Sequence, residues 1–321
     1  MFFLFPGQGA QYPGMALDFL NEHAGEEARR LFSLASEITG IDMLKLLRDS
    51  GPEELKRTDL SQPAITLANL AAASSLAGRG IEASGCAGFS LGEYAALKIA
   101  GIIGEEDCFS LVNQRGKAMQ AALDRMAGGA GMAAVTGLAP EKVEALITEW
   151  KNNGLDDLYT ANINSHRQVV VSGNDAALEE AGKRFKESGA RRVLRLQVAG
   201  PFHSPFMKEA ADEFAHALEK VTFKDPTIPV FSNVTGKQIQ SGEEAKNLAL
   251  RHITEGVRWA DEEEAIAMFG PELLLETGPG NVLMGLWKDT GSSVPCLPAG
   301  TVEAINELVP VHKAGHFTGG D

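Results

Sequence analysis

The chain has few cysteines and no arrangement of residues that is typical of a metal site. Its three cysteines, Cys86, Cys108 and Cys296, are scattered and contain no CxxC pair. The seven histidines show no metal-ligand spacing, so we expect no structural metal. In the absence of an export signal, an odd number of scattered cysteines indicates reduced thiols and a cytoplasmic protein.

Long hydrophobic runs and an excess of positive charge are also missing. The apolar run near the N-terminus, FFLF at residues 2–5, stops at Pro6 and is too short for a signal peptide or a membrane span. We expect it to be a buried strand. The formal net charge is −14, which argues against nucleic acid or an anionic membrane as the main partner. The 321 residues are 44% hydrophobic, enough to bury a sizeable core.

Two patterns of elements follow one another along the chain. Over residues 1–125, short apolar runs alternate with helical stretches, which predicts a parallel sheet with helices on both faces. Residues 126–196 instead suggest β-α-β-β-α-β, the ferredoxin-like order, ending in a strand at 191–198. We therefore predict an α/β core from residues 1–125 and 197–321, with a ferredoxin-like small subdomain inserted at 126–196.

The stretch GCAGFSLGEYAAL, residues 85–97, contains Gly-x-Ser-x-Gly between a predicted strand and a predicted helix. This is the nucleophile-elbow pattern, in which a sharp turn exposes the serine oxygen, here that of Ser90. The N–H of Leu91 and the start of the helix would then stabilise a developing oxyanion. The alternative is a helix N-cap, with Glu93 completing a capping box.

A serine nucleophile needs a general base, and His203 is the best candidate. It lies in the loop AGPFHSPFM, residues 199–207, just after a predicted strand. Loops at strand ends are where open sheets carry their catalytic residues. A buried structural histidine is the alternative. His166, His216 and His252 compete for the role.

Eight motifs occur in order and together resemble the malonyl-CoA:acyl-carrier-protein transacylase family, which includes acyltransferases of polyketide synthases. They are FPGQGAQYPGM (5–15), QPAI (62–65), GFSLGEYAAL (88–97), QRGKAMQ (114–120), ANINSHRQVVVSG (161–173), GPFHSPFM (200–207), FSNVTG (231–236) and ETGPGNVLMGL (276–286). The resemblance covers nearly the whole chain. It implies an α/β-hydrolase-like core with an inserted ferredoxin-like subdomain, in agreement with the pattern of elements.

The resemblance also implies a reaction and a catalytic set. Ser90 matches the acylated serine and His203 its general base and acid, in a ping-pong transfer of malonyl from malonyl-CoA to the pantetheine thiol of acyl carrier protein. Gln11 and Leu91 match the residues whose N–H groups form the oxyanion hole. No bound cofactor is implied, and we expect a monomer.

Four further positions match residues around the substrate. Arg115 matches the clamp for the malonyl carboxylate, and the resemblance favours this role. A structural salt bridge or a solvated helix face is the alternative for a charge in mid-helix. Phe202 matches a position that favours malonyl over methylmalonyl. Asn162, with Asn164 nearby, matches a polar segment at the entrance, where turn chemistry is the alternative. His252, which we group with them, matches a position whose backbone carbonyl orients the base; the family usually has glutamine there.

The chain departs from the family at Phe89, where histidine is usual, and at Asn281, where a basic residue is usual. Phe89 leaves open a second interpretation, a serine hydrolase that releases acyl groups from carrier proteins. The stretch at 183–195 carries six cations and one acid. We hypothesise that it guides an acidic carrier protein to the site. The sequence does not distinguish fatty-acid from polyketide synthesis.

Overall fold

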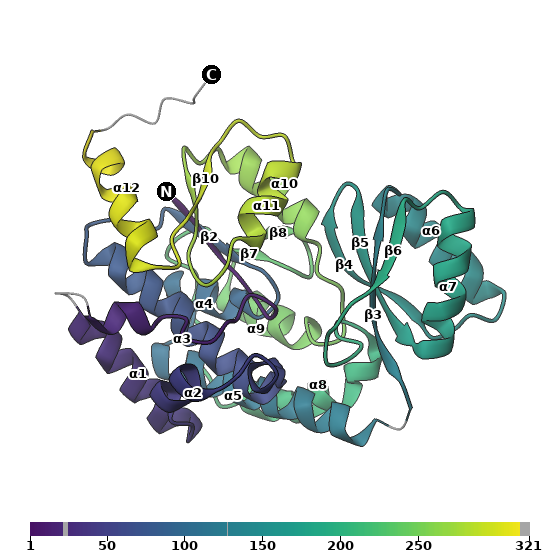
Figure 1. The fold of residues 1–321 in the computed structure, drawn as a ribbon, viewed down its shortest axis with the longest axis horizontal. Helices are drawn as coiled ribbons and strands as arrows, with labels where there is room; N and C mark the ends of the chain where they lie inside the picture. Colours follow the sequence, from purple (N-terminus) through teal and green to yellow (C-terminus); the bar gives the residue numbers. More distant parts are fainter. Residues whose placement is uncertain (22–24, 127, 315–321) are drawn as a thin grey trace.

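A parallel sheet of four strands forms the centre of the larger part of the molecule (Figure 1). The computed structural model describes residues 1–21, 25–126 and 128–314. The strands lie in the order β10-β9-β1-β2, namely β10 (Cys296–Pro298), β9 (Leu274–Glu276), β1 (Phe2–Phe5) and β2 (Gly85–Gly88). The N-terminal strand is therefore central, with neighbours from residues 85 and 274.

The side chains of β1 explain why its four residues are all apolar. Phe2 and Leu4 belong to one hydrophobic cluster and Phe3 and Phe5 to another, because successive side chains of a strand point to opposite faces. Both faces are covered by helices, so neither set is exposed. The predicted buried strand at residues 2–5 is confirmed.

The helices divide between these two clusters. The cluster of Phe3 and Phe5 is shared by α1 (Gly25–Thr39), α2 (Met43–Asp49), α3 (Thr58–Ala77), α4 (Gly92–Ile99), α5 (Glu105–Arg125), α8 (Lys208–Leu218), α9 (Gly242–Arg251) and α12 (Val302–Ala314). The cluster of Phe2 and Leu4 is shared by α10 (Trp259–Phe269) and α11 (Val282–Asp289). A short hairpin, β7 (Phe231–Ser232) and β8 (Lys237–Gln238), lies beside β2. None of the helices in the described ranges combines the length and apolar character that a membrane crossing needs.

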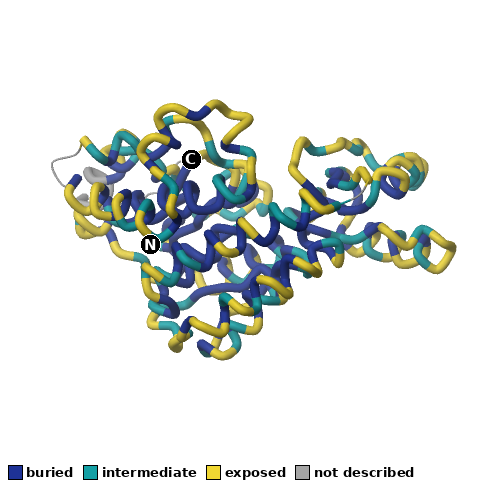
Figure 2. Tube along the Cα trace, turned by 90° about the horizontal axis from the view of Figure 1, so that it is seen from below, coloured by how far each residue is buried: buried dark blue, intermediate teal, exposed yellow. Residues whose placement is uncertain are grey.

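A second sheet is built from one continuous segment, which we call the insert (residues 130–195). Its elements are β3 (Ala130–Thr136), α6 (Pro140–Asn152), β4 (Leu158–Ser165), β5 (Gln168–Asn174), α7 (Asp175–Glu187) and β6 (Arg192–Arg195). The strands are antiparallel in the order β4-β5-β3-β6. A separate cluster that includes Val135, Trp150 and Phe185 forms its interior. Figure 2 shows buried positions in dark blue within both parts of the molecule.

The predicted fold class is confirmed: a parallel α/β core carries a β-α-β-β-α-β insert. The domain boundaries at 125/126 and 196/197 stay a prediction. The strand expected at 191–198 is shorter, because β6 ends at Arg195. The residues that follow it leave the sheet and line the cavity described below.

Candidate active site

Ser90 stands on a sharp turn between β2 and α4. Its φ is +49°, in the left-handed region that side chains disfavour. The glycines around it are required by packing: a Cβ on Gly88 would lie 2.1 Å from the carbonyl carbon of Gly92, and a Cβ on Gly92 would lie 2.0 Å from the Phe5 oxygen. The Gly-x-Ser-x-Gly pattern thus reflects the close crossing of strand and helix.

The capping box is not observed. The Ser90 hydroxyl bonds to a histidine, and the Glu93 carboxylate accepts from the backbone N–H of Asn233 instead of reaching back to Ser90. Both side chains of the expected box are therefore engaged elsewhere.

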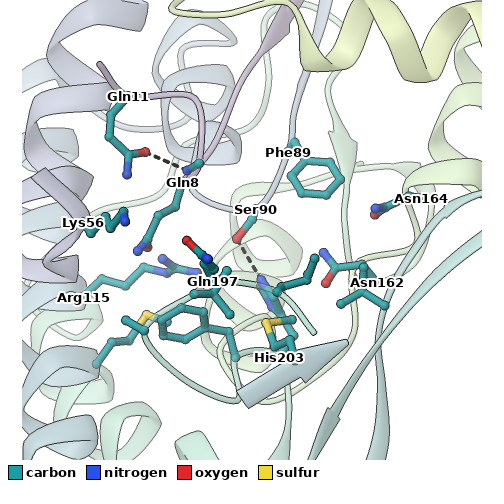
Figure 3. Close-up of a pocket in the computed structure, with 18 residues that line it drawn as sticks. Gln8, Gln11, Lys56, Phe89, Ser90, Arg115, Asn162, Asn164, Gln197 and His203 are labelled. Carbon is teal, nitrogen blue, oxygen red and sulfur yellow. Dashed lines mark hydrogen bonds between the residues drawn. The ribbon is translucent and has the colours of Figure 1, made fainter. Parts of the chain in front are cut away.

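His203 lies opposite Ser90 (Figure 3), and its two ring nitrogens have different partners. Nε2 is 2.8 Å from Ser90 Oγ, and Nδ1 is 2.9 Å from the carbonyl oxygen of His252. A carbonyl oxygen only accepts, so in the neutral ring Nδ1 carries the proton. Nε2 is then free to accept the proton of the Ser90 hydroxyl. His203 also has a positive φ, +55°, so both members of the pair lie on strained backbone.

Burial, together with the positive charge of Arg115, lowers the pKa of His203 to about 4. The imidazole is consequently neutral at physiological pH, the form that can accept a proton. Within the described ranges, no carboxylate bonds to the ring, and the backbone carbonyl of His252 orients it.

The His252 side chain lies behind His203 and outside the cavity. Its ring stacks on that of His203 with centroids 4.9 Å apart, it is fully buried, and neither ring nitrogen has a partner among the described residues. His252 does not line the cavity and contacts His203 through its backbone carbonyl, so its grouping with the substrate residues stays a prediction. The competing His166 and His216 lie at the surface, beside Glu264 and Glu219.

A cavity of about 360 Å³ opens in front of Ser90 and His203. Arg115, from the middle of α5, reaches it although the residue is only 1% exposed. Its Nε and Nη2 atoms have no hydrogen-bond partner, and no carboxylate of the described residues forms an ion pair with it. The expected alternative of a structural salt bridge is therefore not observed. An unpaired guanidinium at a cavity wall can bind a carboxylate in a bidentate manner.

Two backbone N–H groups that the sequence analysis singled out are free of intramolecular acceptors. In the described part of the chain, neither Leu91 nor Gln11 donates its N–H to another group. The Gln11 side chain turns back into its own loop and accepts from the N–H of Gly9 at 2.7 Å. The Ser90 N–H, by contrast, is taken up by the side chain of Asn233.

The remaining expected residues lie at the cavity wall, except Asn281. Phe202 and Phe89 line the cavity, and the ring of Phe89 packs edge-to-face on Trp259 with centroids 5.4 Å apart. Asn162 and Asn164 project from β4 and also line it. Asn281 stands at the N-terminus of α11, away from the cavity lining.

Sequence reasoning missed part of this wall. Gln8, Lys56 and Met119 line the cavity from the core, and Met132, Val170 and the segment 196–199 line it from the insert side. Gln8 and Met119 stand inside motifs that were quoted, so their positions carried a signal. Lys56 stands in a short 3₁₀ helix with no pattern to mark it.

The whole chain is similar to known acyltransferases. A model of the acyl transferase domain family matches residues 2–315. The malonyl CoA-acyl carrier protein transacylase of Escherichia coli K12 is 38% identical over 306 residues, which cover 95% of each chain. That of Bacillus subtilis 168 is 33% identical over 311 residues, covering 97% of this chain and 96% of the relative.

Solved structures agree with this. The malonyl CoA-acyl carrier protein transacylase of Clostridium perfringens superposes with a TM-score of 0.90 at 34% identity, covering 98% of this chain and 97% of that one. A malonyl-transacylase in complex with a type II polyketide synthase acyl carrier protein superposes with a TM-score of 0.89 at 35% identity, covering 97% and 99%. The chain belongs to the acyl transferase domain family, and within it to the malonyl-CoA:acyl carrier protein transacylases.

Proposed function

We propose that this protein moves malonyl from malonyl-CoA to the pantetheine thiol of an acyl carrier protein by a ping-pong reaction on Ser90. The observation that carries the proposal is the contact of 2.8 Å between Ser90 Oγ and the unprotonated Nε2 of His203, beside the unpaired guanidinium of Arg115. These are the groups that acyl transfer from a thioester with a free carboxylate requires.

In the first half-reaction, His203 Nε2 takes the hydroxyl proton while Ser90 Oγ attacks the thioester carbon. The free N–H groups of Leu91 and Gln11 stabilise the tetrahedral oxyanion, and Arg115 holds the malonyl carboxylate. The carbon–sulfur bond breaks, the proton passes from His203 to the departing CoA sulfur, and malonyl remains as an ester of Ser90.

In the second half-reaction, the carrier thiol gives its proton to His203 and attacks the ester. Ser90 leaves, recovers the proton from His203, and malonyl is now a thioester of the carrier. Phe202, 8% exposed at the cavity wall, disfavours an α-methyl group at the malonyl carbon. One methyl group is worth about 1–3 kcal/mol of discrimination, so we expect preference for malonyl over methylmalonyl without full exclusion.

The proposal includes the partner protein, the cofactor requirement, the oligomeric state and the cellular compartment. The carrier carries 4′-phosphopantetheine, no bound cofactor is needed, and the enzyme acts as a monomer in the cytoplasm, where its three free cysteines stay reduced. Asn162, on β4 of the insert, lies at the cavity wall and helps to place the acyl group.

Intact mass spectrometry tests the proposal directly. The protein is incubated with malonyl-, methylmalonyl- or acetyl-CoA, with and without a holo carrier protein, beside Ser90→Ala and His203→Ala variants. We expect malonyl on Ser90 that moves to the carrier, slow loading of the other two, and no adduct on Ser90→Ala. Rapid release of free malonate would favour the hydrolase interpretation that Phe89 leaves open. Equal loading of acetyl and malonyl would contradict the role of Arg115.

A further inference from the structure

A fully buried asparagine clamps the turn that carries Ser90. Asn233 follows β7, and its side-chain amide makes two short hydrogen bonds: Oδ1 accepts from the Ser90 N–H at 2.6 Å, and Nδ2 donates to the Gly88 carbonyl at 2.6 Å. One planar amide thereby spans the residues on both sides of Phe89.

The backbone of Asn233 is fixed as firmly as its side chain. Its N–H donates to Glu93 Oε2 at 2.8 Å, and its carbonyl accepts from the Arg258 N–H at 2.7 Å. The amide is thus anchored to α4 on one side and to the start of α10 on the other. It cannot follow a movement of Ser90 without breaking bonds elsewhere.

The hydrogen bonds of Asn233 explain how Ser90 keeps its strained backbone conformation. A residue with a side chain disfavours φ near +49°, so the turn holds this conformation only when surrounding bonds impose it. The amide bonds to both flanks of the turn do so. They also occupy the Ser90 N–H, while the N–H of Leu91 keeps no acceptor.

We propose that Asn233 is a positioning residue for acylation: its amide holds Ser90 Oγ against His203 Nε2 and leaves the Leu91 N–H free for the thioester oxygen. This inference rests on the proposed role of Ser90 as the nucleophile.

Asn233→Asp tests the clamp without changing its shape. An ionised aspartate still accepts from the Ser90 N–H, but it cannot donate to the Gly88 carbonyl and repels that oxygen. Protonation restores an O–H donor at the same place. The charged and titratable groups around this position are Glu93 on α4, which accepts from the Asn233 N–H, His203 across Ser90, and Arg115 on α5, whose charge acts on both. Glu262 on α10 interacts with Glu93. Full burial of this position favours a protonated aspartate as the pH falls.

We therefore expect a pH-dependent defect. At pH 8, Asn233→Asp lowers the single-turnover rate of Ser90 acylation about 100-fold, the effect of a misplaced reacting group. Lowering the pH to 5 brings the rate back toward that of the wild type at the same pH. Asn233→Ala shows the loss without the recovery. Since the Arg115 side of the cavity is untouched, the concentration of malonyl-CoA that gives half-maximal rate stays unchanged.

The matched control is Asn174→Ala. Asn174 also uses its amide twice, accepting from the Ala177 N–H and donating to Asp157, but at the start of α7. This variant lowers the melting temperature and leaves Ser90 acylation intact. Rates are measured by quenched intact mass and stability by thermal unfolding, with Ser90→Ala in the same series.

Two results would contradict the inference about Asn233, and a third would contradict the proposed function. If both Asn233 variants acylate like the wild type while Ser90→Ala does not, the inference about Asn233 is wrong. If Asn233→Asp and Asn233→Ala are equally slow at every pH and lose activity only in step with their melting temperature, Asn233 is merely structural and the inference is again wrong. If Ser90→Ala is still acylated, the proposed function itself fails.

Discussion

At the scale of single residues, Arg115 combines two opposite demands. A guanidinium that is 1% exposed and without an ion-pair partner among the described residues costs folding free energy, yet the proposed function uses the same charge to bind a carboxylate. We expect Arg115→Met to lower kcat/KM for malonyl-CoA about 100- to 1,000-fold. The substitution removes one partner of the buried ion pair that the guanidinium would form with the carboxylate of bound malonyl. The free energy of unfolding should rise by about 1 kcal/mol or more.

Acetyl-CoA kinetics and urea unfolding check this prediction. Acetyl-CoA has no free carboxylate, so its kcat/KM should not fall in the variant. Arg48→Met is the control, because Arg48 is 60% exposed and paired with its neighbour Asp49. An equal loss for both thioesters would mean that Arg115 supports the site and does not bind the carboxylate.

The pH profile reports on His203. Because burial and Arg115 lower its pKa to about 4, the neutral base is present at all pH values above this. We expect kcat/KM for malonyl-CoA to decline on the acid side with a midpoint near pH 4, well below the ordinary histidine value. In Arg115→Met the nearby charge is gone, so the midpoint should move upward. A midpoint that stays fixed in that variant would contradict the coupling.

The sequence pointed to the residues of the proposed reaction more directly than to the residue that holds their turn in place. Ser90, His203 and Arg115 stand in motifs whose chemistry is local, a serine in a glycine turn or a charge within a helix. Asn233 stands in a quoted motif too, but its partners lie more than a hundred positions away along the chain. No periodicity carries that information.

At the scale of elements, α10 has an unusual interior face. Glu262 and Glu263 are both buried, and neither oxygen of Glu262 has a partner among the described residues. Burial, then the charges of Glu93 and Glu263, raise the pKa of Glu262 well above its ordinary value. A run of acidic residues is typical of a solvated helix start. Sequence polarity alone would therefore wrongly predict that Glu262 and Glu263 are exposed.

Glu262 should make the protein less stable as the pH rises. The unfolded chain releases this proton near the ordinary glutamate pKa, whereas the folded chain keeps it to higher pH. Folding therefore takes up a proton in this window, and stability falls with increasing pH. We expect Glu262→Gln to raise the free energy of unfolding by about 2 kcal/mol at pH 8 and hardly at all at pH 5.

Urea titrations at the two pH values measure this difference. Glu264→Gln serves as the control, because Glu264 lies on the same helix and is 61% exposed. A gain of equal size at both pH values would show that Glu262 is ionised throughout and that its burial acts in another way.

At the scale of the whole molecule, the charge is unevenly distributed. Within the basic stretch 183–195, Lys183, Arg184 and Arg195 pair with acids of the insert, so half of the cations are already neutralised. Arg191 and Arg192 make no ion pair among the described residues and line a second cavity, of about 690 Å³, together with Arg167. This cavity shares no residue with the one at Ser90. We therefore restrict to Arg191 and Arg192 the hypothesis that the basic stretch guides the carrier protein.

We expect the double variant Arg191→Glu and Arg192→Glu to raise the KM for carrier protein about tenfold, mainly through slower association. The KM for malonyl-CoA and transfer to a small thiol should stay unchanged. The double variant Lys183→Glu and Arg184→Glu alters the net charge equally and is the control. Steady-state kinetics at two salt concentrations provide the measurement, and an unchanged carrier KM would reject the hypothesis.

The place of β1 in the sheet has a consequence for biosynthesis. β1 pairs with β9 on one side. β9 follows β2 by roughly 190 residues, or roughly 10 to 40 s of translation. Meanwhile the insert, whose four strands form one sheet of their own, is complete in the nascent chain before Val257, with which β4 forms an isolated bridge. The emerging polypeptide thus carries a finished small unit and an unsatisfied FFLF edge at once. A molecular chaperone that shields this edge would protect the yield of active enzyme during synthesis.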